Sequence, residues 1–152
     1  MNDTTKTEKK YKSHTFKTSL SLTGDRQWEV TSNGGLKLEG GPPPAFSGTD
    51  DRWSSEDLLI SSVNSCHLAS FYAYATRKGF EFISYESEVE GLLEHDGNGF
   101  RFTKIILRPV ITVKSEDDVE TAIQFMKRAH QMCFMGHSVN AEVTVETEVV
   151  VG

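Results

Sequence analysis

The stretch that decides the fold runs from Leu58 to Thr76 and reads LLISSVNSCHLASFYAYAT, without a single Asp, Glu, Lys or Arg. Acidic residues precede it and basic residues follow it, as the dipole of one long helix favours. Ser54 or Ser55 can cap the start of this helix, and Gly79 provides a stop signal. A helix with small or apolar groups on nearly every side is most simply buried inside a protein or a dimer.

The same stretch is long enough to cross a membrane but too polar to do so alone. Its polar residues are Ser61, Ser62, Asn64, Ser65, His67 and Ser70. We therefore expect no membrane association. Residues 1–20 lack the apolar core of a signal peptide, and two cysteines do not make a disulfide scaffold. Reduced thiols and a cytoplasmic location are the favoured interpretation, with a single structural disulfide as the open alternative.

The overall composition is typical of one globular domain. The chain has 152 residues, 37% of them hydrophobic and 25% charged, which is enough to bury a core. The net charge of −6 argues against a nucleic-acid surface. The one basic cluster, Lys9, Lys10 and Lys12, belongs to a polar N-terminal segment. We expect a single domain over residues 1–152, of which residues 1–9 form a disordered tail.

Strand patterns lie on both sides of the predicted helix. Before the helix, the patterns predict two strands between Tyr11 and Thr31, an optional third shortly after them, and a loop over 40–44. After the helix, they predict a strand over 84–94, a hairpin turn over 95–99 and a strand over 100–114. A second helix over 115–133, capped by Ser115, and a strand over 141–151 complete the chain. This order predicts an α+β fold in which two main helices pack against antiparallel sheets.

The chain has two cysteines, and each falls on a helix face that another helix can approach. Cys66 lies on the small-residue side of the first predicted helix, and Cys133 lies on the apolar stripe of the second. If those faces meet, the two sulfurs lie near each other. Free cysteine is often buried and inert, and a reactive thiolate needs a nearby cation. Redox chemistry, a purely structural pair and a metal site are therefore all open.

For a metal site, Cys66-His67 and His130-x-x-Cys133 offer the two thiolates and two imidazoles of a tetrahedral zinc centre. Adjacent residues on a helix point about 100° apart, however, so Cys66 and His67 cannot easily share one ion. His67 is more often a buried polar group with its hydrogen bonds satisfied. We therefore expect neither a metal nor a bound cofactor.

Several segments together resemble the OsmC/Ohr family. They are Trp53-Ser54-Ser55-Glu56-Asp57-Leu58-Leu59, Ser65-Cys66-His67-Leu68, Arg77-Lys78-Gly79, Phe102–Pro109 and Ala129-His130-x-x-Cys133-Phe134. The resemblance runs from about Thr23 to the end of the chain, and Ser-Cys-His at the first cysteine is most similar to an OsmC-like subgroup. It implies an intertwined α+β homodimer with two active sites at the subunit interface, and a thiol-dependent peroxidase that reduces organic hydroperoxides.

The resemblance also implies a role for particular residues. Cys66 matches the peroxidatic cysteine, Cys133 the resolving cysteine and Glu56 the family glutamate. The arginine that stabilises the thiolate matches Arg26 in an early turn, with Arg52 as the alternative. The implied partners are an organic hydroperoxide and a dithiol reductant of the lipoyl type. The candidates for an apolar lining around the thiols are Phe46, Trp53, Phe71, Tyr72, Phe134 and Met135.

Helix geometry adds one inference about the dimer. Ten helical residues rise about 15 Å. If Glu56 and Cys66 belong to one continuous helix, they cannot share an active site within a single chain. We therefore predict that Glu56 and the arginine act on the thiol of the partner subunit. The alternative function is a non-catalytic OsmC-like module that binds a small apolar ligand at the dimer interface.

Overall fold

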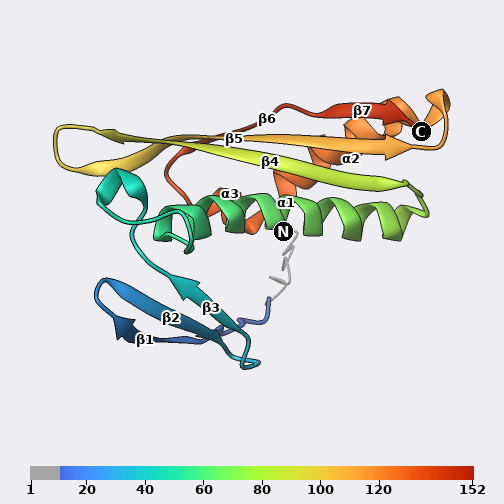
Figure 1. Ribbon diagram of the computed structural model, residues 1–152. Helices are drawn as coiled ribbons and strands as arrows, with labels where there is room; N and C mark the ends of the chain where they lie inside the picture. The colour runs from blue at the N-terminus through green and yellow to red at the C-terminus, as the bar shows by residue number, and fades with distance from the viewer. Residues whose placement is uncertain (1–10) are drawn as a thin grey trace, which may run out of the picture. The chain divides into compact units, whose positions relative to one another are not determined.

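The computed structural model describes residues 11–152, and the tail predicted for residues 1–9 lies outside them. The chain divides into two units, one that ends at Ser54 and one from Ser55 to Gly152. Strands build the first unit, and helices packed on strands build the second (Figure 1). The architecture is α+β, as predicted.

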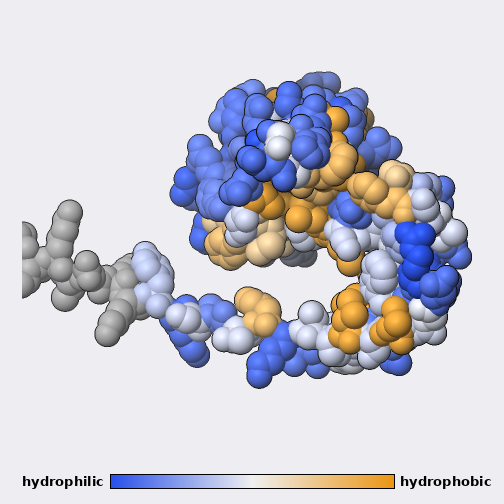
Figure 2. Space-filling view, turned by 90° about the vertical axis from the view of Figure 1, so that its left-hand side faces the viewer, coloured by the Kyte–Doolittle hydropathy of each residue, from blue (hydrophilic) through white to orange (hydrophobic). Residues whose placement is uncertain are grey.

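The N-terminal unit is a three-stranded antiparallel sheet in which each strand pairs with the next. Its strands are β1 (Thr18–Gly24), β2 (Gln27–Ser32) and β3 (Lys37–Gly40). Asp25 and Arg26 form the predicted tight turn between β1 and β2, and Arg26 adopts a left-handed φ of 55° there. Every residue of β1 is exposed, and Figure 2 shows apolar side chains reaching the surface of the molecule.

The predicted proline-rich loop follows β3. It contains one 3₁₀ turn, η1 (Pro44–Phe46), and it returns so that Trp53 bridges to Gly40. A Cβ atom on Gly48 would lie 1.6 Å from the carbonyl oxygen of Pro42, so only glycine fits at this position.

Helix α1 (Ser55–Lys78) opens the C-terminal unit and is one continuous helix. Its buried residues recur at intervals of four along one side: Val63, His67, Phe71 and Ala75. It ends at Gly79, whose φ of 68° is the left-handed conformation that glycine adopts without strain. None of the helices in residues 11–152 combines the length and hydropathy needed to span a bilayer.

The sheet of the C-terminal unit is mixed, which corrects the antiparallel sheet expected from the sequence. Strands β4 (Ser84–His95) and β5 (Phe100–Val113) form the predicted antiparallel hairpin. The chain end forms two short strands, β6 (Glu142–Val145) and β7 (Glu148–Val151), and both run parallel to β5. They are parallel because a helical segment carries the chain back across the sheet before they begin (Figure 1).

Pro109 accounts for the break between the two terminal strands. The pairing of β6 with β5 ends at Leu107, and the pairing of β7 resumes at Val110. The break therefore lies opposite Pro109, which has no N–H to donate to a neighbouring strand. One strand over 141–151 was the expectation, and the alternating pattern alone does not reveal this interruption.

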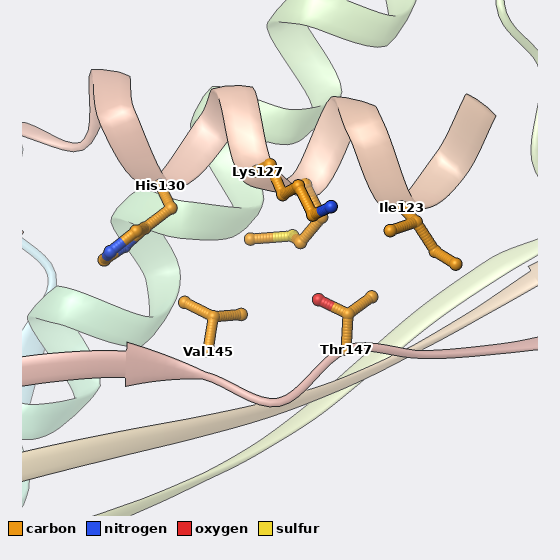
Figure 3. A pocket seen from close by; sticks show the side chains of 6 residues that line it. Ile123, Lys127, His130, Val145 and Thr147 are labelled. Atoms are coloured by element: carbon orange, nitrogen blue, oxygen red, sulfur yellow. The ribbon is translucent and has the colours of Figure 1, made fainter. Parts of the chain in front are cut away.

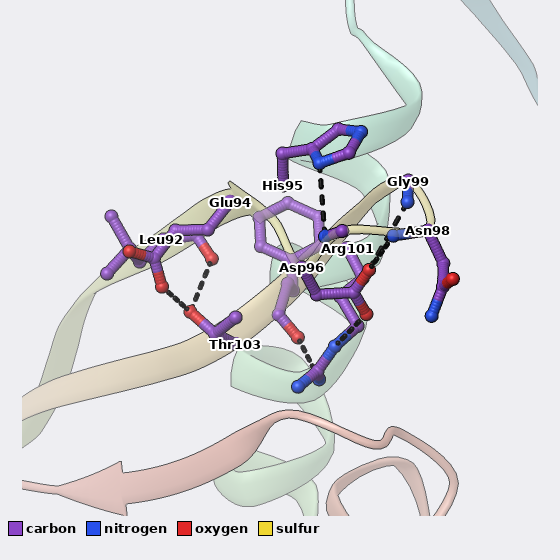
Figure 4. A network of polar contacts seen from close by, with 10 residues as sticks. Leu92, Glu94, His95, Asp96, Asn98, Gly99, Arg101 and Thr103 are labelled. Atoms are coloured by element: carbon purple, nitrogen blue, oxygen red, sulfur yellow. Dashed lines mark hydrogen bonds and ion pairs between the residues drawn. The ribbon is translucent and has the colours of Figure 1, made fainter.

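The turn between β4 and β5 is held by one carboxylate (Figure 4). Asp96 Oδ1 accepts the backbone N–H groups of Asn98 and Gly99, at 2.9 and 3.2 Å. Its other oxygen accepts Arg101 Nε at 3.0 Å. Gly97 has a φ of 97° in this turn. These bonds give the hairpin turn predicted for 95–99 its physical basis.

The second helical segment starts and ends differently from the prediction. A 3₁₀ turn, η2 (Glu116–Asp118), leads into α2 (Val119–Met132), and a short helix α3 (Phe134–His137) follows Cys133. Ser115 does not cap a backbone N–H. Its hydroxyl instead donates to the Asp118 carboxylate at 3.0 Å, which competes with a capping bond to the backbone.

Two buried clusters hold the C-terminal unit together. The larger joins α1 and α2 to the C-terminal end of strand β5. Its members are Phe71, Ala75, Ile111, Val113, Ala122, Met126 and Ala129. The smaller consists of Val63, Ile105 and Leu107. Phe71 is fully buried and packs against Phe82 and Tyr85, so it belongs to the core and does not line a substrate site.

Candidate active site

Cys66 lies near the middle of α1 and is partly exposed. Its neighbours Val63 and His67 are fully buried: Val63 packs on Ile105 and Leu107 of β5, and His67 bonds to His130 of α2. Helical spacing places Cys66 at the edge of that buried side, about 100° around the helix from His67. A thiol in this position can be reached by a small molecule and by a second side chain at once.

Cys133 lies where α2 passes into α3, and its side chain is fully buried. Its backbone is extended, with φ −71° and ψ 111°, so the chain turns at this residue. The sulfur accepts the backbone N–H of Gly136 at 3.2 Å. On its other side, the thiol points at the carbonyl oxygen of Val63 on α1, at a sulfur–oxygen distance of 4.0 Å.

Cys133 lies beside the turn of α1 that carries Cys66, since its sulfur is 4.0 Å from the carbonyl oxygen of Val63, but the two sulfurs are not at disulfide-bonding distance. Burial is the main reason that the pKa of Cys133 rises to about 11, the N–H of Gly136 opposes the rise, and hydrogen bonding and charge interaction with Cys66 add to it. Both cysteines are free thiols. One thiol of the pair is therefore buried and protonated at neutral pH, and the other is partly exposed.

A pair of imidazoles lies directly beside the thiols. Nε2 of His67 is 2.9 Å from Nδ1 of His130, and the two rings stack with their centroids 5.2 Å apart. His67 is buried as the sequence suggests, and its Nδ1 lies 2.8 Å from the carbonyl oxygen of Val63. Within residues 11–152, no three His, Cys, Asp or Glu side chains are grouped to hold a metal ion.

Glu56 lies in the first turn of α1, ten residues before Cys66. Because α1 is continuous between them, the two residues are separated by a rise of about 15 Å. The trans prediction assumes one continuous helix from Glu56 to Cys66, and α1 is continuous between them. Glu56 and Cys66 of one chain therefore do not share a site.

Both candidate arginines belong to the N-terminal unit and lie around one small cavity of about 190 Å³. The Arg26 guanidinium donates to the carbonyl oxygens of Phe46 and Ser47, at 2.6 and 2.8 Å. Arg52 pairs with Glu39 at 3.5 Å, and its buried Nε has no hydrogen-bond partner in the part of the chain that the structure describes. The two candidates are therefore neighbours, and Arg26 is held by backbone while Arg52 retains a free donor.

The sequence indicates His130 as a candidate zinc ligand and as part of an OsmC/Ohr-like segment, but it does not predict the bond of His130 to His67. Besides its bond to His67, His130 lines a cavity of about 270 Å³ between α2 and the β6–β7 segment. Figure 3 shows Ile123, Lys127 and His130 on α2 facing Val145 and Thr147 across this cavity. The sequence offers one signal for this pair, because His67 directly follows Cys66 and His130 precedes Cys133 by one helical turn.

These features, a long helix that is buried along one side and carries a central cysteine, and a second cysteine after α2, are those of an OsmC-like protein. Residues 48–148 match the model of the OsmC-like protein family, and the chain belongs to that family. Among curated proteins it is 26% identical to YmaD of Bacillus subtilis, an uncharacterized protein, over 109 residues that make up 70% of this chain and 73% of YmaD.

Solved structures share the fold over nearly their whole length. An OsmC-like protein of unknown function from Vibrio cholerae, VCA0330, has a TM-score of 0.80 at 21% identity, covering 89% of this chain and 99% of that one. An organic hydroperoxide resistance protein from Elizabethkingia anophelis, solved with thiocyanate bound, has a TM-score of 0.71 at 20% identity, covering 91% and 99%. At these identities the likeness establishes the OsmC-like fold.

Proposed function

We propose that this protein is a thiol-dependent peroxidase that reduces organic hydroperoxides to alcohols through a disulfide cycle between Cys66 and Cys133. The observation that carries the proposal is geometric: a partly exposed thiol lies on α1, and the buried thiol after α2 lies 4.0 Å from the carbonyl oxygen of Val63, three residues before Cys66. Family membership supports it, as do fold relatives that are organic hydroperoxide resistance proteins, one from Elizabethkingia anophelis and another from Legionella pneumophila.

The first step is attack of the Cys66 thiolate on the distal oxygen of the hydroperoxide. The sulfur–oxygen bond forms as the oxygen–oxygen bond breaks, and the alkoxide takes up a proton and leaves as the alcohol. Cys66 becomes a sulfenic acid and is oxidised by two electrons. Its partial exposure suits this role, since the peroxide must reach the sulfur.

In the second step Cys133 attacks the sulfenic sulfur of Cys66. The disulfide forms, the sulfur–oxygen bond breaks, and hydroxide leaves as water with the proton of the Cys133 thiol. A raised pKa keeps Cys133 protonated until this step, and the N–H of Gly136 favours the thiolate as it develops. A dithiol then reduces the disulfide by exchange; we propose a lipoyl-type reductant in the cytoplasm, where thiols stay reduced.

Glu56 and one arginine complete the site from the partner subunit in this scheme. The continuous α1 keeps Glu56 about 15 Å from Cys66 in its own chain, which favours action across a homodimer interface. Arg26 is our choice for the group that stabilises the thiolate, with Glu56 orienting its guanidinium, and Arg52 is the alternative. The exposed leucines of β1, Leu20 and Leu22, fit a surface that a second copy covers.

Titration of thiols tests the proposal. Cumene hydroperoxide is added to the reduced protein, and free thiols are counted with time. A peroxidase loses two thiols per chain rapidly, forms an internal disulfide and recovers both with dihydrolipoate. A module that only binds an apolar ligand at the interface loses none, or loses them no faster than free cysteine does, and that result would refute the enzyme.

A further inference from the structure

The bond between His67 and His130 joins the two helices that carry the thiols. His67 directly follows Cys66 on α1, and His130 lies one turn before Cys133 on α2. Their ring nitrogens are 2.9 Å apart. A short bond between these two side chains therefore fixes the relative position of the two backbone segments from which the sulfurs project.

The partners of His67 set the direction of this bond. A carbonyl oxygen only accepts, so His67 Nδ1, which is 2.8 Å from the carbonyl of Val63, carries its proton. Burial is the main reason that the pKa of His67 is lowered; the bond to the carbonyl of Val63 opposes the fall, and His130 and His137 add to it, so the neutral ring is favoured. Its Nε2 then has a lone pair and accepts the proton that His130 carries on Nδ1.

The chain of donors ends at the atom that the buried thiol also faces. His130 donates to His67, and His67 donates to the carbonyl oxygen of Val63. The sulfur of Cys133 lies 4.0 Å from that same oxygen. The imidazole pair and the resolving thiol are thus anchored to one point of α1, three residues before Cys66.

We propose that the His67–His130 bond is a clasp that positions Cys66 and Cys133 for formation of their disulfide. Neither ring touches substrate in this role, so both are positioning residues. The benefit of such a clasp to the protein rests on the proposed function, in which Cys66 and Cys133 form a disulfide. The effect of the clasp on how readily the two cysteines form a disulfide can, however, be measured without any peroxide.

The experiment measures how readily the disulfide forms at equilibrium. The reduced protein is equilibrated in mixtures of reduced and oxidised glutathione and quenched with acid. The fraction with a Cys66–Cys133 disulfide is then counted by alkylation and mass spectrometry. The overall exchange converts two protein thiols and one oxidised glutathione into one protein disulfide and two reduced glutathiones, so atoms and electrons balance.

His130→Asn and His130→Gln form the matched pair of variants. The amide of Asn lies near the place of the imidazole Nδ1 and can still donate to His67, whereas the amide of Gln reaches the place of Nε2. We expect His130→Gln to lower the equilibrium constant about tenfold, about 30 mV in potential, and His130→Asn to stay within about threefold of the wild type. His137→Asn, which removes the nearby imidazole but not the bond, is the control and should stay close to the wild type.

Equal equilibrium constants for the Asn and Gln variants would overturn the clasp, and so would a wild type that forms no internal disulfide. Thermal unfolding of each variant shows that the comparison is made between folded proteins. If the wild type does not react with cumene hydroperoxide, but forms the disulfide with glutathione about tenfold more readily than His130→Gln does, the peroxidase fails and the clasp stands. If peroxide reacts normally and the two variants are alike, the clasp fails and the peroxidase stands.

Discussion

Cys66 lies in the middle of a long helix and is partly exposed, whereas Cys133 lies at a break between two helices and is fully buried. The first has neighbours of its own helix on both sides, and the second accepts a backbone N–H and has its pKa raised to about 11, mainly by burial. Two identical side chains thus differ in how far solvent and substrate can reach them. In the proposed cycle, this difference suits Cys66 to the attack on substrate and Cys133 to the later, protected step.

The largest effect expected from this asymmetry is on peroxide turnover. Cys66→Ser should lower the rate of cumene hydroperoxide consumption by at least about 10³-fold, because it removes the nucleophile. Cys133→Ser should retain one rapid turnover and then accumulate a sulfenic acid at Cys66, which dimedone traps. Stopped-flow assays with mass spectrometry check both variants. The reverse pattern, with the single turnover retained in Cys66→Ser, would invert the assignment.

Alkylation of the reduced wild type compares the two thiols directly. With a pKa of about 11, about one Cys133 in a thousand is a thiolate at pH 8. We expect iodoacetamide to modify Cys133 about 10²-fold more slowly than Cys66, and the Cys133 rate to rise about tenfold per pH unit up to pH 10. Peptide mapping of initial rates gives both numbers. Comparable rates at pH 8 would show that Cys133 is neither buried nor protonated in solution.

A mixed dimer tests whether Cys66, unlike Cys133, depends on the partner subunit. One subunit carries Cys66→Ser and the other carries Glu56→Ala. Under the trans scheme one site inherits both changes and the other keeps both wild-type groups, so we expect about half of the wild-type activity. Peroxidase assays of the purified mixed dimer and of the two mutant homodimers measure this. Activity no higher than that of the homodimers would mean that Glu56 does not act in trans.

The raised pKa of Cys133 also predicts how stability depends on pH. The unfolded thiol has its usual pKa of about 9, so on raising the pH it loses its proton before the folded one does. The contribution of Cys133 to the free energy of unfolding is therefore fully present below pH 9 and is lost as the pH rises toward 11. We expect the free energy of unfolding to fall by about 1–2 kcal/mol over this window, in denaturant titrations at each pH. In Cys133→Ala this portion of the fall should be missing.

The smallest expected effect is on stability at neutral pH. Cys133→Ala removes a fully buried sulfur and should cost about 1 kcal/mol, since the cavity is only partly refilled. Cys66→Ala should change the free energy of unfolding by less than about 0.5 kcal/mol, because the sulfur is partly exposed and alanine favours helix. Urea titrations of both variants provide the comparison. Equal changes in the free energy of unfolding would show that the two sulfurs do not differ in packing.

Local sequence signals were sufficient wherever neighbouring residues supply the physical cause. The charge-free stretch between acidic and basic flanks, closed by Gly79, predicted α1 almost to the residue, since dipole, cap and stop signal all lie within the helix. The turn over 95–99 was equally readable, because Asp96 holds it through its own backbone neighbours. The expected cap at Ser115 was wrong, since Asp118 offered its hydroxyl a competing partner.

The sequence by itself determined α1, the central part of the second helical segment, the hairpin and the existence of two candidate thiols, because composition and period act over a few residues. Only the tertiary structure decided that β6 and β7 run parallel to β5 with a break opposite Pro109, since strand direction depends on how α2 returns the chain. It alone brought His67 to His130 and the thiol of Cys133 to the carbonyl of Val63, residues that lie 63 and 70 positions apart. Contacts over such separations follow from the packing of whole elements, which no local pattern encodes.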